Sequence, residues 1–127
     1  MAEAQAGGLE GRRILVVEDE YMVAGEVVGE LEARGALVVG PVPTVARALE
    51  IVEASGALDG AVLDVNLHDE MAFPVADALA ARGVRFVLST GYDKAVIPER
   101  FAGVPRCEKP VDPVEIADAL ARHLAKG

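Results

Sequence analysis

Short aliphatic runs alternate along the chain with longer segments in which apolar residues recur at helical spacing. Residues 14–17 form a continuous apolar run, typical of a parallel strand that is buried on both faces of a sheet. Behind this run, Val23, Val27 and Leu31 follow helical spacing, and Gly35 is placed to end a helix. The pattern therefore predicts one strand followed by one helix.

This strand and helix unit repeats downstream. A second strand is predicted over 36–39, and Thr44 is placed to cap a helix that ends near Gly56. A third strand is predicted over 61–67, followed by a helix over 73–83. The chain thus carries three such units in its first two thirds.

The last third continues the alternation less regularly. A fourth strand is predicted over 84–88, but the segment 93–103 contains Pro98 and has weak periodicity, which favours a short or mobile helix. A fifth strand over 104–108 is polar and contains Pro105, so we expect it at an edge of the sheet.

The final helix has the clearest start signal in the sequence. Asp112 can act as its cap, Pro113 takes its first position, and Glu115 is spaced as in a capping box. Five strands that alternate with helices predict an α/β fold, with a parallel sheet covered by helices on both faces. We expect the strand order 2-1-3-4-5, as in flavodoxin-like folds.

Size, charge and cysteine content narrow the function classes. The 127 residues suit one domain, which we place at 12–127 behind a flexible tail at 1–11 that lacks the features of a signal peptide. The net charge of -9 argues against nucleic acid as a partner, and no apolar run has membrane-spanning length. Cys107 is the only cysteine, which excludes an intramolecular disulfide and fits a cytoplasmic protein.

Several polar residues follow the predicted strands directly, at the edge of the sheet where α/β folds place their ligands. These residues are Glu18, Asp19, Asp64, Thr90 and Lys109. Strands one and three are neighbours in the expected order, so the acids would lie side by side. A bound divalent cation would relieve their repulsion, and Mg²⁺ suits carboxylates that leave room for a phosphate.

A carboxylate beside such a cation can also act as a nucleophile. Asp64 could attack a phosphoryl group and form an aspartyl phosphate. The ammonium of Lys109 and the hydroxyl of Thr90 would then stabilise the transferring group, together with the metal. The residues alone therefore predict a phosphoryl site.

The sequence from about Arg12 to Leu124 resembles the receiver domains of bacterial two-component response regulators. Residues 14–20 look like the family's first strand with its acidic pair, and Asp64 matches the phosphoacceptor. The resemblance implies that the backbone carbonyl of Asn66 completes the metal shell, and that Lys109 precedes a cis peptide bond at Pro110. Thr90 matches the family's switch hydroxyl.

The sequence departs from the family at the position of its aromatic switch residue, where it has Arg106. Residues 86–92 are similar to a largely stand-alone subgroup whose fourth strand reads Phe-x-Phe-Ala-Thr-Gly-Tyr, with Leu88 and Ser89 as differences. We therefore expect switching by ordering of the segment 93–101. His68 lies in the polar loop near Asp64, where it could approach the phosphate, but nothing in the sequence orients it and we expect a solvated loop residue.

The resemblance implies a stand-alone receiver. It would accept a phosphoryl group from a sensor histidine kinase or phosphotransfer protein, and would act by contact with a downstream protein or as part of a phosphorelay. It would not be an enzyme in its own right. One alternative is an adaptor that no longer uses its site. Another is a phosphatase of the haloacid dehalogenase type, although that class has a second acid where this chain has Asn66.

Overall fold

The computed structural model describes residues 7–68, 70–91 and 97–125, and a parallel sheet lies at its centre. The strands are β1 (Arg13–Val17), β2 (Leu37–Val42), β3 (Gly60–Asp64), β6 (Arg85–Thr90) and β7 (Arg106–Glu108). Their order is β2-β1-β3-β6-β7, and every pair is parallel. This confirms the predicted order, with β7 at an edge.

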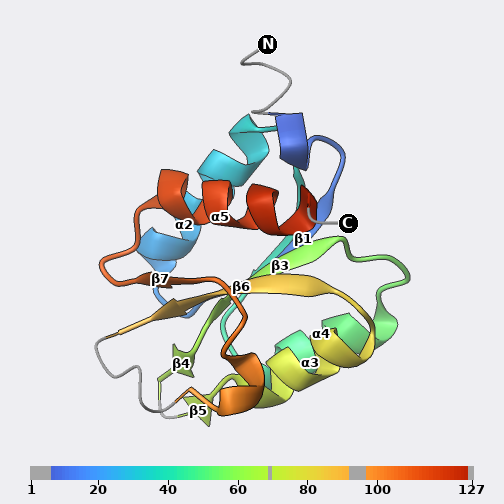
Figure 1. Ribbon diagram of the computed structural model, residues 1–127, viewed down its shortest axis with the longest axis vertical. Helices are drawn as coiled ribbons and strands as arrows, with labels where there is room; N and C mark the ends of the chain where they lie inside the picture. Colours follow the sequence, from blue (N-terminus) through green and yellow to red (C-terminus); the bar gives the residue numbers. More distant parts are fainter. Residues whose placement is uncertain (1–6, 69, 92–96, 126–127) are drawn as a thin grey trace.

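Helices cover both faces of the sheet (Figure 1). Helices α2 (Tyr21–Ala33) and α5 (Pro113–Ala125) lie on one face, and α3 (Val45–Ala54) and α4 (Phe73–Ala81) lie on the other. The predicted flavodoxin-like α/β class is confirmed. Among the described residues, none of these helices is both long and apolar enough to cross a membrane.

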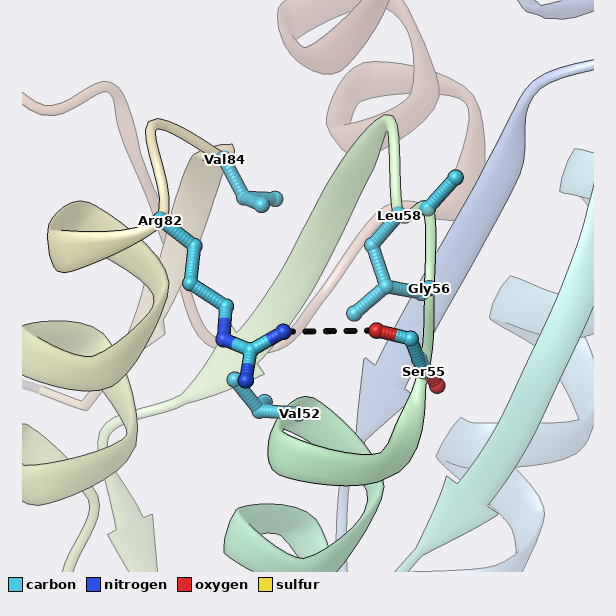
Figure 2. Close-up of a pocket in the computed structure, with 7 residues that line it drawn as sticks. Val52, Ser55, Gly56, Leu58, Arg82 and Val84 are labelled. Carbon is cyan, nitrogen blue, oxygen red and sulfur yellow. Dashed lines mark hydrogen bonds between the residues drawn. The ribbon is translucent and has the colours of Figure 1, made fainter.

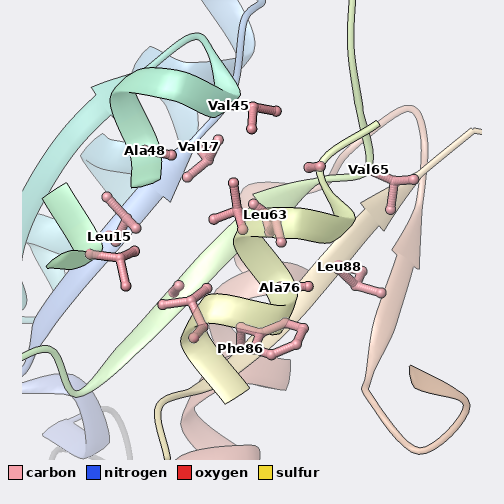
Figure 3. Close-up of a cluster of buried hydrophobic side chains, with 14 of the residues drawn as sticks. Leu15, Val17, Val45, Ala48, Leu63, Val65, Ala76, Phe86 and Leu88 are labelled. Carbon is pink, nitrogen blue, oxygen red and sulfur yellow. The ribbon is translucent and has the colours of Figure 1, made fainter. Parts of the chain in front are cut away.

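Two apolar clusters form the core, one on each face of the sheet. Alternation along each strand divides its side chains between them: Leu63 and Leu88 belong to the α3 and α4 side (Figure 3), whereas Val62 and Val87 belong to the α2 and α5 side. Because the central strands are buried on both faces, they read as continuous aliphatic runs in the sequence.

Several element ends follow the expected local chemistry. The Thr44 hydroxyl accepts a hydrogen bond from the amide of Arg47 at 3.2 Å and so caps α3. The Asp112 carboxylate accepts one from the amide of Val114 at 3.0 Å at the start of α5. Beyond α2, Gly35 has φ of +88°, which glycine adopts without steric cost.

The predicted flexible tail is wrong for its second half. Residues 1–6 lie outside the described part of the chain, but Gly7–Leu9 form the 3-10 helix η1. Leu9 is fully buried in the cluster on the α2 and α5 side. A lone leucine in a glycine-rich segment carries no periodicity, so this packing cannot be predicted from the sequence pattern.

The segment predicted as a short or mobile helix is only partly described. Residues 92–96 lie outside the described chain, whereas Glu99–Phe101 form the 3-10 helix η3. The Phe101 ring is buried, with its centroid 6.0 Å from that of Phe73 and 6.0 Å from that of Phe86. The short helix is therefore present at the Phe101 end, and switching by ordering of the segment 93–101 stays a prediction.

A small hairpin interrupts the chain after β3. The predicted strand over 61–67 is too long, because β3 ends at Asp64. The next residues form β4 (Asn66–Leu67), which pairs antiparallel with β5 (Glu70–Met71). This hairpin places His68 in a turn next to the end of β3.

Candidate functional site

Asp64 is the last residue of β3, and its side chain is almost completely buried. Only 1% of the residue is exposed. Its neighbours are the ends of β1 and β6, because Val17 pairs with Leu63 and Asp64 pairs with Ser89. The amide of Asn66 donates a hydrogen bond to Asp64 Oδ1 at 3.2 Å, so the hairpin after β3 also fixes this carboxylate.

The three predicted acids come together at this edge of the sheet. Glu18, Asp19 and Asp64 each place one carboxylate oxygen within 4.8 Å of the others. Glu18 is buried, and the Asp19 side chain is 7% exposed. Buried carboxylates this close repel one another, and a hard divalent cation that prefers oxygen ligands fits such a group.

The electrostatics of the acids reflect this crowding. Burial, together with the charge of Asp64, raises the pKa of Glu18 to about 8, although the Glu20 amide opposes this by donating a 3.0 Å hydrogen bond to Glu18. Burial also raises the pKa of Asp64, against the opposing charge of Lys109. The carboxyl groups of Glu18 and Asp64 together therefore hold a proton readily when no cation is present.

Lys109 supplies the positive charge of the site. Its Nζ lies 3.1 Å from Asp64 Oδ1 and 3.1 Å from Oδ2. Burial disfavours the ammonium, but the Asp64 carboxylate outweighs burial and raises the pKa of Lys109. The Lys109–Pro110 peptide bond is cis, as the resemblance implied.

Two hydroxyls end strand β6 beside Asp64. Thr90 is buried, and its Oγ1 donates a hydrogen bond to the carbonyl oxygen of Gly91 at 3.1 Å. The structure thus places Thr90 at the predicted edge, with its hydroxyl bonded to the backbone. Ser89, its neighbour, is 1% exposed and pairs with Asp64 across the sheet.

Asn66 and Arg106 occupy the places that the sequence indicated. Asn66 is exposed in β4 and contacts Asp64 through its backbone. Arg106 begins the edge strand β7, where it pairs with Leu88, and it is partly exposed. An arginine at this position cannot act as an aromatic rotamer switch.

From the sequence we expect His68 to be a solvated loop residue, but the structure connects this residue to the site. Its Nδ1 lies 3.0 Å from Asp19 Oδ2, while its side chain remains 79% exposed. His68 has φ of +58°, an unusual value for a residue other than glycine. Only the hairpin turn brings the imidazole to Asp19, and sequence spacing does not reveal that turn.

A pocket of about 290 Å³ lies away from these residues (Figure 2). Val52, Leu58 and Val84 form its apolar wall, and the Arg82 guanidinium donates hydrogen bonds to the carbonyl oxygens of Ser55 at 3.3 Å and Glu53 at 3.1 Å. Val52 lies in the last turns of α3, and the other lining residues lie between α3 and β3 or between α4 and β6. The pocket is therefore at the end of the sheet where these strands begin, opposite to the end that carries the acids. Arg82 satisfies the end of α3 there, and the pocket takes no part in the acidic site.

Comparison with solved structures shows close likeness over almost the whole chain. The solution structure of SdrG from Sphingomonas melonis Fr1 is 41% identical, with a TM-score of 0.77 over 91% of this chain and 97% of that one. The BeF3-activated conformation of SdrG from Pseudomonas melonis Fr1 is 43% identical, with a TM-score of 0.72 over 88% and 95% of the two chains.

A more distant likeness shows the fold alone. A response regulator receiver protein from Sinorhizobium medicae WSM419 is 23% identical, with a TM-score of 0.79 over 93% of this chain and 98% of that one. No family model matches the chain, and no curated protein matches it.

Proposed function

Because the chain belongs to the receiver domains of response regulators, we propose that it accepts a phosphoryl group on Asp64 and signals through that modification. One observation carries the proposal: a buried carboxylate at a strand end has an ammonium 3.1 Å from both of its oxygens and two further acids beside it. A structural ion pair would not require the two additional acids, which cost free energy through repulsion.

Glu18, Asp19 and Asp64 are the residues that would hold Mg²⁺, with the backbone carbonyl of Asn66 completing the shell. When bound, the cation neutralises charge on the oxygens of the transferring phosphoryl group. The crowded, proton-holding carboxylates favour this assignment, since a cation replaces the proton and relieves the repulsion.

Besides the metal, four residues of the chain have separate roles in phosphoryl transfer. Asp64 is the nucleophile, and Asn66 orients it through the hydrogen bond to Oδ1. Lys109 can turn from the carboxylate to the phosphoryl oxygens, because its ammonium already lies over both Asp64 oxygens. Thr90 would give up its bond to Gly91 and donate to the phosphoryl group, which links phosphorylation to the loop after β6.

The partners follow from this chemistry. A histidine kinase or phosphotransfer protein in the cytoplasm would supply the phosphoryl group, and a downstream protein would read the result. Arg106 excludes the aromatic rotation, so the readout would depend on Thr90 and the loop that follows it. The protein would act as a phosphoacceptor that assists its own chemistry, without turning over a separate substrate.

Intact mass measurement tests the proposal. The protein is incubated with acetyl phosphate and Mg²⁺, beside Asp64→Asn, a metal-free sample and Asp77→Asn as a control acid on the surface of α4. We expect one phosphoryl adduct in the parent and in Asp77→Asn, and none in Asp64→Asn or without metal.

A negative result leads to a second phosphodonor, a histidine kinase. Absence of an adduct with both donors would favour the unused adaptor. Steady release of phosphate from a free ester would favour the phosphatase. Since BeF3 activates the similar SdrG from Pseudomonas melonis Fr1, spectral changes on adding beryllium fluoride provide an independent check of the same site.

A further inference from the structure

A row of side chains crosses the sheet at the level of Asp64. Leu63, Val65 and Leu88 belong to the cluster on the α3 and α4 side (Figure 3), so alternation directs Asp64 and Ser89 to the opposite face. Asp64 pairs with Ser89, and Ser89 pairs in turn with Cys107. Neighbouring strands lie about 4.8 Å apart, so Ser89 is the next side chain to Asp64 on this face.

Asp64 therefore has different neighbours on its two sides. On β1, the acid Glu18 follows Val17, which pairs with Leu63, so Glu18 flanks Asp64 on one side. On β6, the Ser89 hydroxyl flanks it on the other side. The two sides thus offer Asp64 a carboxyl group and a neutral hydroxyl donor.

The hydroxyl of Ser89 has no hydrogen-bond partner. Every other buried side-chain nitrogen or oxygen in the described part of the chain has one. Ser89 is 1% exposed, so bulk water does not compensate. An unpaired buried hydroxyl costs folding free energy, and such groups in native structures call for a functional explanation or a missing partner.

The Asp64 carboxylate is already occupied in this state. Oδ1 accepts a hydrogen bond from the Asn66 amide and lies 3.1 Å from Lys109 Nζ, and Oδ2 accepts a hydrogen bond from Lys109 Nζ at 3.1 Å. Phosphorylation changes this, because one oxygen enters the bond to phosphorus and the ammonium of Lys109 is drawn to the phosphoryl charge. The other carboxyl oxygen then loses the ammonium of Lys109 and can accept from a further donor in addition to the Asn66 amide.

We propose that Ser89 is a further catalytic residue, whose hydroxyl donates to the free carboxyl oxygen of phosphorylated Asp64 and shortens the life of the phosphoryl group. This inference rests on the proposed function. In hydrolysis a water oxygen bonds to phosphorus, the bond from phosphorus to Asp64 breaks, and its electron pair returns to the Asp64 carboxylate. Both hydrogens of the water end on the phosphate product.

The direction of the effect follows from charge. A donor on the second carboxyl oxygen stabilises the carboxylate as it leaves, because negative charge grows there in the transition state. Thr90 is assigned to the phosphoryl oxygens, so the two neighbouring residues of β6 would serve opposite ends of the bond that breaks. Alternation along the strand makes this division necessary, since their side chains face opposite sides of the sheet.

The test compares rates of phosphoryl loss after acetyl phosphate is removed, followed by intact mass in the full chain. We expect Ser89→Ala to slow the loss about two- to tenfold, the effect of one neutral hydrogen bond. Ser89→Cys keeps the shape and offers a weaker donor, so it should also slow the loss, by a smaller factor. Cys107→Ala is the matched control, because it truncates the next buried side chain of the same row without reaching Asp64, and its rate should equal that of the parent.

A purely structural role for Ser89 predicts the reverse pattern. Then Ser89→Ala would change the midpoint of thermal unfolding and leave the rate of phosphoryl loss alone, whereas our proposal requires a slower rate in a fold at least as stable as the parent. Rates in Ser89→Ala and Ser89→Cys equal to or faster than the parent overturn the inference and leave the proposed function standing. Failure of the parent to form an Asp64-dependent adduct overturns both.

Discussion

Lys109 Nζ lies 3.1 Å from each carboxylate oxygen of Asp64, so one ammonium covers both atoms that a phosphoryl group or a cation would use. This placement gives the lysine two opposite effects. It stabilises negative charge that arrives on a phosphoryl group, and it repels a cation from the same carboxylate.

Lys109→Met should separate these two effects. We expect the variant to bind Mg²⁺ about two- to tenfold more tightly, because a positive charge beside the ligand carboxylate is removed. We expect its phosphorylation by acetyl phosphate to slow about tenfold or more, because the transferring group loses a charged donor. Calorimetric titration at pH 9 and intact mass time courses measure the two quantities.

Arg47→Met is the control for this comparison. It removes the same formal charge from the exposed face of α3, where Arg47 pairs with Glu50 at 3.1 Å. The Mg²⁺ affinity and the rate of phosphorylation of Arg47→Met should stay at their parent values. Weaker metal binding in Lys109→Met would show that the lysine holds Asp64 in place for the cation, contrary to the repulsion that we infer.

The pH dependence of stability should report the proton held by Glu18. Its pKa is raised from 4.5 to about 8 in the folded protein, so between these values the folded state binds more protons than the unfolded state. Without metal, the free energy of unfolding should therefore fall as pH rises from 5 to 8, by up to a few kcal/mol. Urea unfolding in the presence of a chelator, at several pH values, measures this slope.

Glu18→Gln supplies the control for the pH effect. The amide has nearly the same shape and does not titrate, so the slope between pH 5 and 8 should flatten. Mg²⁺ should stabilise the parent most at high pH, where it no longer competes with the proton. An equal slope in parent and variant would assign the pH dependence to other groups.

The sequence predicted the parts of the site that depend on strand ends. Glu18, Asp64 and Thr90 follow or end aliphatic runs, and parallel strands bring such residues to one edge regardless of loop detail. Thr44 was predictable as a cap for a similar reason, because the bond is local. Periodicity and capping are properties of short segments, so the sequence contains them.

The parts that were missed depend on long-range contact. Leu9 is buried against elements distant in sequence, and His68 reaches Asp19 through a hairpin of two-residue strands, which are too short to show a period. The unpaired state of Ser89 is likewise a property of its surroundings. A single hydroxyl in a strand looks the same in the sequence whether or not a partner faces it.

Phe101 should anchor the described end of the loop that follows β6. Its buried ring contacts Phe73 and Phe86, and Arg100 lies over it with Cζ 4.7 Å from the ring centroid. Phe101→Ala should cost about 3–5 kcal/mol in the free energy of unfolding, since it removes a large buried side chain. Asp77→Asn, which weakens only the exposed ion pair with Arg100, should change it little. Urea unfolding measures the free energy of unfolding of both variants. A similar decrease in Phe101→Ala and Asp77→Asn would show that the Asp77–Arg100 ion pair, and not the Phe101 ring, holds this end of the loop.

Two glycines should respond in opposite directions to the same change. Gly40 in β2 has φ of +101°, and a Cβ there would lie 2.8 Å from the carbonyl oxygen of Val16 and 3.0 Å from the amide nitrogen of Val42. Both neighbours are backbone atoms of the sheet and cannot yield cheaply, so Gly40→Ala should destabilise the fold by about 2 kcal/mol or more. Gly29 lies inside α2 with open space around its Cβ position, so Gly29→Ala should stabilise by about 0.5–1 kcal/mol. Urea unfolding of the two variants measures both changes in the free energy of unfolding. A stabilised Gly40→Ala would mean that the backbone around residue 40 in β2 can shift away from Val16 and Val42 without a cost in stability.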